Sequence, residues 1–120
     1  MKKVLIAEDD AFILDIATTK LTQKGFIVEK TADGNSVVPM LLELQPDILL
    51  LDLLLPNKHG FEILMDIRAH AELATLPVIV FSNETGLDIE EKAALYNAHY
   101  FFKALTGTGE LVAKIEELLQ

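Results

Sequence analysis

Short apolar segments alternate with longer segments of helical periodicity along all 120 residues, and this alternation constrains the fold more than any other feature. The apolar segments, which favour β-strands, cover residues 4–7, 26–31, 48–51, 77–81 and 100–102. The other segments, which place apolar residues on one helical face, cover residues 12–24, 34–44, 61–69, 88–96 and 110–119. Strands that alternate with helices predict a parallel β-sheet covered by helices.

The composition of the strands narrows the topology. The first, third and fourth predicted strands are apolar throughout, as expected where helices cover both faces of a sheet. Right-handed crossovers between five strand–helix units favour the flavodoxin-like sheet order 2-1-3-4-5. No internal repeat, linker or low-complexity tract interrupts the pattern. The sequence therefore predicts an α/β fold, a (βα)5 three-layer sandwich that forms a single domain over residues 1–120.

Several residues predict where the helices begin and end. Gly25 is expected to end the first helix as its C-cap, and the second helix is expected to end before Pro46. Asp88 is expected to cap the fourth helix at its N-terminus. Gly107 and Gly109 are expected to form a turn before the last helix.

The charge balance and the cysteine count exclude several classes of function. Ten basic residues stand against 19 acidic ones, a formal net charge of −9, so the surface repels nucleic acid phosphates and tolerates a divalent cation. The absence of cysteine excludes disulfides and thiol catalysis. No secretion signal is visible, and no apolar run approaches the roughly 20 residues that span a bilayer. We therefore expect a soluble, cytoplasmic domain that binds neither nucleic acid nor membrane directly.

Polar side chains follow four of the five predicted strands. These residues are Glu8 and Asp9 after the first strand, Asp52 after the third, Ser82 after the fourth and Lys103 after the fifth. Because the carboxyl ends of parallel strands share one edge of a sheet, we expect these side chains to meet where the strand order reverses. Packed carboxylates repel one another unless a cation lies among them, and Mg²⁺ suits a small carboxylate group. A carboxylate can also accept a phosphoryl group, whose charge a lysine and a hydroxyl would help to neutralise.

The motifs at these strand ends resemble those of the receiver domains of two-component response regulators. The resemblance rests on residues 4–10, 50–56 with Gly60 after them, 78–82 and 100–103, and it extends over essentially the whole chain. It implies a phosphorylation switch and not a metabolic enzyme. The phosphoryl donor would be a sensor histidine kinase or a phosphotransfer protein. The output partner, an effector protein or a fused output domain, would bind the face built from the fourth helix, the fifth strand and the fifth helix.

The resemblance also implies a role for each residue of the phosphoryl site. Asp52 would be the phosphorylated nucleophile. Ser82 would hydrogen-bond a phosphoryl oxygen, and Lys103 would pair with the phosphoryl group. Tyr100 would be the aromatic switch residue, whose ring moves inward when the Ser82 hydroxyl is drawn toward the phosphoryl group.

For the metal site, the resemblance implies Mg²⁺ as the cofactor. Asp9, Asp52 and the backbone carbonyl of Leu54 would be direct ligands, and Glu8 would hold a metal-bound water. Asp10 has no implied role at the metal and is expected to be an acid in the first turn of the first helix, where the helix dipole favours negative charge.

Three positions depart from the family pattern, at residues 59, 83 and 104, and His59 stands where an acid or amide is common. Ala104 stands where a proline is usual, so the peptide bond between Lys103 and Ala104 is expected to be trans. Asn83 is bulkier than usual and is expected to narrow the opening to the phosphoryl site. Leu54 would place an apolar side chain near the path of hydrolytic water. These two residues predict a phosphoaspartate that lasts longer than minutes, although Glu84 would act in the opposite direction.

Other functions remain open on the same fold. Ala104 and Asn83 allow a pseudo-receiver, a phosphorylation-independent interaction module, but the intact phosphoryl site opposes it. A phosphatase with an aspartate nucleophile would usually carry a second acid where Leu54 stands. A flavin-binding protein would need a phosphate-binding loop where the acids after the first strand would repel phosphate. The histidines show no spacing suited to a metal and are expected to be ordinary surface or edge residues: His59, His70 and His99.

Overall fold

The computed structural model describes residues 1–120, apart from the side chain of Leu105. One parallel sheet has the strand order β2-β1-β3-β4-β5, which confirms the predicted α/β fold class and topology. Its strands are β1 (Lys3–Ala7), β2 (Ile27–Thr31), β3 (Ile48–Leu51), β4 (Val78–Ser82) and β5 (Ala98–Phe102). The α-helices are α1 (Ala11–Gln23), α2 (Val37–Leu44), α3 (Gly60–Ala69), α4 (Leu87–Leu95) and α5 (Thr108–Leu118). Short 3₁₀ helices are η1 (Gly34–Ser36), η2 (Ala71–Leu73) and η3 (Lys103–Leu105). None of the described helices combines the length and the apolar character needed to cross a membrane.

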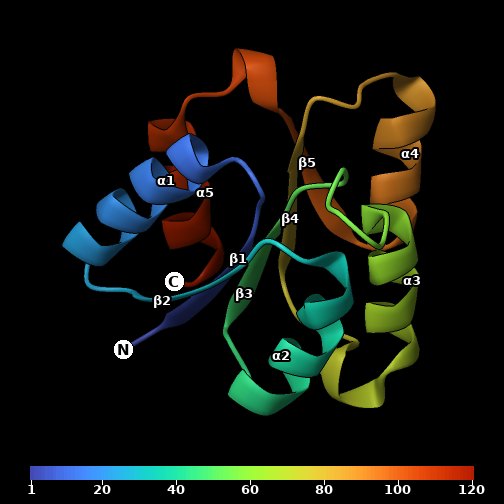
Figure 1. Ribbon diagram of the computed structural model, residues 1–120, viewed down its shortest axis with the longest axis horizontal. Helices are drawn as coiled ribbons and strands as arrows, with labels where there is room; N and C mark the ends of the chain where they lie inside the picture. The colour runs from blue at the N-terminus through green and yellow to red at the C-terminus, as the bar shows by residue number, and fades with distance from the viewer.

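Helices cover both faces of the sheet (Figure 1). Helices α1 and α5 lie against one face, and α2, α3 and α4 lie against the other. Successive residues of β3 point to opposite faces: Leu49 and Leu51 join the core beneath α2 to α4, whereas Ile48 and Leu50 join the core beneath α1 and α5. All four side chains are at most 4% exposed. This burial on both faces explains why β3 is apolar throughout.

The register of the sheet brings the ends of β1 and β3 together. Ala7 pairs with Leu51 of β3 and with Thr31 of β2. The next residue of each strand continues the pairing, because the Asp52 N–H donates to the Ala7 carbonyl at 2.9 Å and the Glu8 N–H donates to the Thr31 carbonyl at 3.0 Å. The sheet itself therefore fixes the backbone of the two acids that follow β1 and β3.

The predicted start of α4 was wrong by one residue. The helix begins at Leu87, and the carbonyl of Gly86 accepts from the N–H groups of Ile89 and Glu90 at 3.1 and 3.2 Å. Gly86 is therefore the N-cap, and Asp88 lies inside the first turn. Its negative charge there still interacts favourably with the helix dipole.

Further boundaries also differ from prediction. Residues 34–36, expected in the second α-helix, form the 3₁₀ helix η1, and Ser82, expected after the fourth strand, is its last residue. Strand β5 begins at Ala98, because Ala98 still pairs with Val78 of β4 although the exposed His99 breaks the apolar pattern. Gly109 lies within the first turn of α5, which begins at Thr108, and not in a preceding turn. The C-cap of α1 is Lys24, so Gly25, which was expected to be the C-cap, lies one residue beyond it, with φ 92°. The described chain contains no cis peptide bond, so Lys103 and Ala104 are joined in trans, as predicted.

The loop between β3 and α3 is held by two close approaches of backbone. The Gly60 N–H donates to the Leu53 carbonyl at 2.8 Å, and a Cβ at Gly60 would lie 2.6 Å from the Leu53 Cα. Gly34 of η1 lies against Lys58 in the same way, since a Cβ there would lie 2.6 Å from the Lys58 carbonyl oxygen. Neither position has room for a side chain, so the two glycines fix the path of this loop.

Arg68, the only arginine of the sequence, joins α3 to two other segments. Its guanidinium donates to backbone carbonyls of the turn after α4 and of the segment from the end of η2 to the start of β4. The acceptors are Tyr96 at 2.7 Å, Asn97 at 3.3 Å, Leu73 at 3.0 Å, Ala74 at 3.3 Å and Leu76 at 2.9 Å. One side chain thus joins α3 to two other segments through hydrogen bonds to their backbone carbonyls.

Candidate functional site

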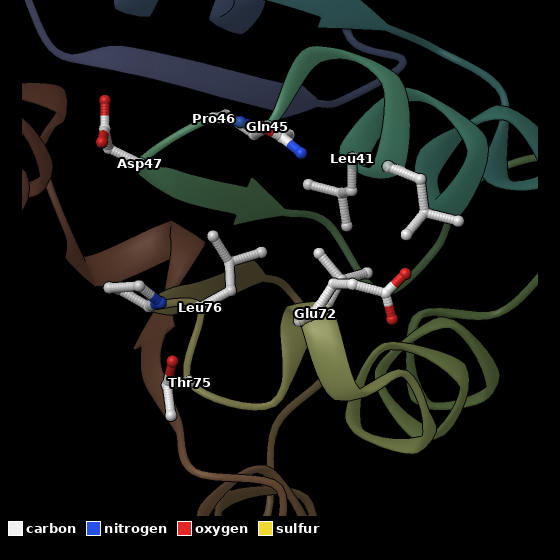
Figure 2. Close-up of a pocket in the computed structure, with 10 residues that line it drawn as sticks. Leu41, Gln45, Pro46, Asp47, Glu72, Thr75 and Leu76 are labelled. Atoms are coloured by element: carbon white, nitrogen blue, oxygen red, sulfur yellow. The ribbon is translucent and has the colours of Figure 1, made fainter.

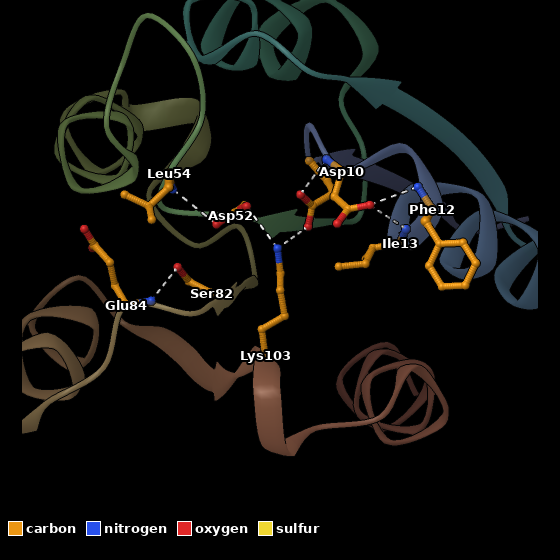
Figure 3. Close-up of polar contacts among 9 residues, drawn as sticks. Asp10, Phe12, Ile13, Asp52, Leu54, Ser82, Glu84 and Lys103 are labelled. Carbon is orange, nitrogen blue, oxygen red and sulfur yellow. Dashed lines mark hydrogen bonds and ion pairs between the residues drawn. The ribbon is translucent and has the colours of Figure 1, made fainter.

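Two buried carboxylates lie at the sheet edge where β1 and β3 end (Figure 3). Glu8 follows β1 and is 3% exposed. Asp52, labelled in Figure 3, follows β3 and is 6% exposed. Neighbouring backbone groups orient both: the Asp10 N–H donates to Glu8 Oε2 at 3.0 Å, and the Leu54 N–H donates to Asp52 Oδ1 at 3.2 Å. The sheet and the two following loops therefore hold these acids in one pocket.

Lys103 lies between the two acids. It follows β5, and its Nζ lies 2.7 Å from Glu8 Oε1 and 3.1 Å from Asp52 Oδ2. The side chain is 11% exposed, and the ammonium also lies 5.5 Å from the centre of the Phe81 ring. The structure thus brings together three charged residues that are distant in the sequence, as predicted.

Burial and charge shift the pKa values of this group. Burial raises the pKa of Glu8 above its ordinary value; the Asp52 charge adds to the effect, and hydrogen bonds from Lys103 and from the Asp10 backbone only partly offset it. Burial acts to lower the pKa of Lys103, but hydrogen bonds and charges from Glu8 and Asp52 outweigh it, so the Lys103 pKa is raised. Lys103 is therefore a cation at neutral pH. Its single ammonium contacts two acids, Glu8 and Asp52.

Asp9 completes a set of three carboxylates. One oxygen atom from each of Glu8, Asp9 and Asp52 lies within 4.8 Å of the others, and Asp9 is exposed, so the set opens to solvent. Oxygen ligands with excess negative charge and access to water suit Mg²⁺. The residues present therefore fit the predicted cofactor, while their ligand roles, and that of the Leu54 backbone carbonyl, remain predictions.

Ser82 and Tyr100 are joined through Glu84. Ser82 is the last residue of β4 and fully buried, and its Oγ accepts from the Glu84 N–H at 3.2 Å. The Tyr100 hydroxyl donates to the Glu84 carbonyl, and the Tyr100 ring is partly buried against the core beneath α2 to α4. The ring of Tyr100 thus lies inward, and its role as a switch remains a prediction.

Asp10 has a different place from the predicted one. It is the N-cap of α1, where its Oδ1 accepts from the N–H groups of Phe12 at 3.0 Å and Ile13 at 3.3 Å, and so it lies before the first turn and not in it. Aspartate directly before a helix is a known capping signal, so this position was accessible from the sequence. The cap fixes the start of α1 beside the acidic pair.

His59 is more than the surface residue that was predicted. Its ring caps α3, because Nδ1 accepts from the Phe61 N–H at 3.1 Å. Its Nε2 lies 3.1 and 3.0 Å from the two carboxylate oxygens of Glu84, in the segment between β4 and α4. Histidine is not among the favoured capping residues, and Glu84 is distant in the sequence, so no local signal identified either contact.

A separate hollow of about 570 Å³ lies at the opposite end of the strands, beside the segments that lead into β3 and β4 (Figure 2). Its polar groups include Asp47, whose carboxylate accepts from the Lys3 N–H at 2.7 Å, and Glu72, which is exposed. The rest of its wall is mainly apolar and includes Leu41, Leu42, Pro46, Leu73, Leu76 and Pro77. The three-carboxylate set and its lysine lie at the other end of the strands, so this hollow is not the predicted site.

Comparisons with known proteins agree with this geometry. The DNA-binding dual master transcriptional regulator RpaA of Synechocystis sp. is 33% identical over 82 residues, which are 68% of this chain and 34% of that protein. The match thus spans about a third of the length of that relative. The crystal structure of a CheY-like response regulator receiver domain protein from Methanospirillum hungatei superposes with a TM-score of 0.87 at 25% identity, covering 99% of this chain and 94% of that one.

A more distant structure shows the same fold. Chemotaxis protein CheY4 of Vibrio cholerae superposes with a TM-score of 0.87 at 21% identity, covering 98% of each chain. The family model described as the response regulator receiver domain matches residues 4–116, from the first strand into the last helix. The chain therefore belongs to the response regulator receiver domains of two-component systems.

Proposed function

We propose that this domain is a phospho-acceptor switch in which Asp52 takes a phosphoryl group from a histidine kinase or a phosphotransfer protein. The observation that carries the proposal is the contact of the buried Asp52 carboxylate with Lys103, beside the carboxylates of Glu8 and Asp9. This arrangement supports the proposal, because Asp52 would be the nucleophile, Lys103 the cation and the three carboxylates the oxygen ligands of one pocket.

The transfer step uses residues that the structure already orients. An oxygen of Asp52 attacks the phosphorus atom of the donor and forms a P–O bond, while the bond from phosphorus to the donor imidazole nitrogen breaks and its electron pair stays on that nitrogen. Lys103, whose Nζ lies 3.1 Å from Asp52 Oδ2, offers positive charge to the phosphoryl oxygens. The Ser82 oxygen accepts from the Glu84 N–H, so the Ser82 hydroxyl proton is free to donate to a phosphoryl oxygen.

The proposed cofactor is Mg²⁺, held by Asp9, Asp52 and the Leu54 backbone carbonyl. Both Glu8 carboxylate oxygens already accept hydrogen bonds, from Lys103 and from the Asp10 backbone, which favours a contact of Glu8 with the ion through water. Bound there, Mg²⁺ would supply positive charge that neutralises the phosphoryl oxygens.

The proposed output is a change of binding partner, in the cytoplasm, and not the turnover of a metabolite. Tyr100 of β5 contacts the segment before α4, and α4 exposes Leu87 and Leu95 at 72% and 80%, which offers apolar contact to an effector protein or a fused output domain. A net charge of −9 disfavours direct contact with DNA. DNA binding of the kind named for RpaA would therefore reside in a separate output segment.

The proposal predicts that wild-type protein incubated with acetyl phosphate and Mg²⁺ gains the mass of one phosphoryl group. The Asp52→Asn variant should gain none, because an amide is a poor nucleophile. Intact-mass spectrometry measures both, and chelation of Mg²⁺ with EDTA should suppress the gain. A wild-type chain that stays unmodified would support the phosphorylation-independent interaction module instead.

A second prediction concerns the lifetime of the phosphoaspartate, which we expect to exceed minutes. The Leu54 side chain is 51% exposed and lies beside Asp52 at the mouth of the pocket (Figure 3), where it hinders the approach of water. The decay of the added mass after removal of the donor, with Mg²⁺ present, measures this lifetime. The Leu54→Asn variant should decay several-fold faster, and a wild-type half-life below about a minute would contradict the expectation.

A further inference from the structure

Glu84 holds the segment between β4 and α4 through three contacts. Its N–H donates to Ser82 Oγ at 3.2 Å, its carbonyl accepts from the Tyr100 hydroxyl, and its carboxylate oxygens lie 3.0 and 3.1 Å from His59 Nε2. We propose that His59 is a positioning residue for phosphoryl transfer: it holds the Glu84 carboxylate at the rim of the pocket, away from the incoming phosphoryl group. This inference rests on the proposed function.

The geometry of His59 defines the direction of the contact. Its Nδ1 accepts from the Phe61 N–H at 3.1 Å, so Nδ1 carries no proton and the ring proton lies on Nε2. Nε2–H therefore donates to the Glu84 carboxylate. The imidazole is held at both nitrogens, and its ring centre also lies 5.5 Å from that of Phe61. A ring fixed in this way bridges the start of α3 to the segment before α4.

The position of Glu84 explains why this bridge matters for an anionic substrate. Glu84 lies two residues after Ser82, and Figure 3 shows its carboxylate turned toward Leu54 and away from Lys103. The pocket already contains three carboxylates against the ammonium of Lys103. A released Glu84 carboxylate would be attracted by Lys103 and would repel a phosphoryl donor. The contact with His59 prevents this competition.

The test separates the bridge from the helix cap. Asparagine at position 59 is a favoured N-cap, so the His59→Asn variant keeps the cap of α3 but is too short to reach Glu84. We expect His59→Asn to slow phosphorylation by acetyl phosphate with Mg²⁺ by about three- to fivefold, as for one partly screened charge. Removing that charge with Glu84→Gln should restore the rate in the His59→Asn background.

A matched control removes the same charge elsewhere. Glu43→Gln changes an exposed residue near the C-terminal end of α2, so it should leave the wild-type rate unchanged and should not rescue His59→Asn. A merely structural role of His59 would make His59→Asn slow phosphorylation by the same factor with and without the Glu84→Gln substitution, and that outcome would overturn the inference.

The failure of this inference is distinguishable from the failure of the proposed function. If the wild type is phosphorylated and His59→Asn reacts at the same rate, only the role of His59 is wrong. If the wild type takes no phosphoryl group, the proposed function and the kinetic effect are both wrong. Amide hydrogen exchange of residues 83–86 decides independently whether His59 holds this segment: it should be faster in His59→Asn, and unchanged exchange would refute the bridge.

Discussion

Replacing Lys103 with methionine is expected to lower the free energy of unfolding by about 3–5 kcal/mol at neutral pH, because removing one partner leaves buried charges uncompensated. Glu8 and Asp52 are 3% and 6% exposed, and both contact the Lys103 ammonium. Methionine fills much of the same volume, so the effect arises mainly from the lost charge and its hydrogen bonds.

The loss of stability caused by Lys103→Met should become smaller as the pH falls. Burial already raises the pKa of Glu8 above its ordinary value of 4.5, and without Lys103 this pKa rises further. Between the unfolded and the folded pKa the folded state binds a proton that the unfolded state releases, so stability increases as the pH falls through the raised folded pKa toward 4.5. Urea denaturation followed by far-UV circular dichroism at several pH values measures this dependence.

Two further variants check the cause. Lys24→Met removes an exposed lysine whose ammonium lies 3.8 Å from Glu116, and it should cost less than about 1 kcal/mol. Adding Asp52→Asn to Lys103→Met removes one of the uncompensated acids and should recover part of the loss. A Lys103→Met protein as stable as the wild type at neutral pH would show that the lysine does not compensate these acids.

Replacing Arg68 with methionine is expected to lower the free energy of unfolding by about 2–4 kcal/mol, because several backbone carbonyls lose a charged donor at once. These carbonyls belong to the turn after α4 and to the segment before β4, which Arg68 joins to α3. Methionine retains most of the apolar stem of the side chain, so packing changes little.

The predicted loss of stability is large because the guanidinium carries three donor nitrogens that reach several carbonyls at once. Arg68→Lys keeps the charge but offers one ammonium in place of three donor nitrogens spread over two segments, so an intermediate loss is expected. Urea denaturation gives the stability, and amide exchange around Tyr96 and Asn97 shows whether the turn after α4 loosens. A loss below about 0.5 kcal/mol for Arg68→Met would mean that water replaces the guanidinium without cost.

The strands and the pocket were predictable because both depend on local pattern. Strand β3 is apolar in every residue, which indicates a central strand with helices on both faces, and Asp52 directly follows it. In a parallel sheet every strand ends at the same edge, so the polar residue after each strand is placed near the others without any knowledge of distant contacts. Glu8 and Lys103 were located by this reasoning.

The contacts that sequence reasoning missed are made by long side chains across the fold. Arg68 reaches the carbonyl of Tyr96, and His59 reaches Glu84; neither pair has a spacing that periodicity describes. Strand β5 was predicted too short because the exposed His99 interrupts its apolar run, whereas backbone pairing with β4 continues. Such features depend on which segments the completed fold places side by side.

The two glycine contacts of the β3–α3 loop have a consequence for how this pocket can adapt. Gly60 lies against Leu53 and Gly34 against Lys58 with no room for a Cβ, so this loop, the platform that presents Asp52, accepts no side chain at either position. The opposite side, around Glu84, is secured by side-chain hydrogen bonds that can be exchanged for others. Variation in signalling behaviour within such a scaffold would therefore accumulate on the Glu84 side, while the two glycine positions of the platform stay fixed.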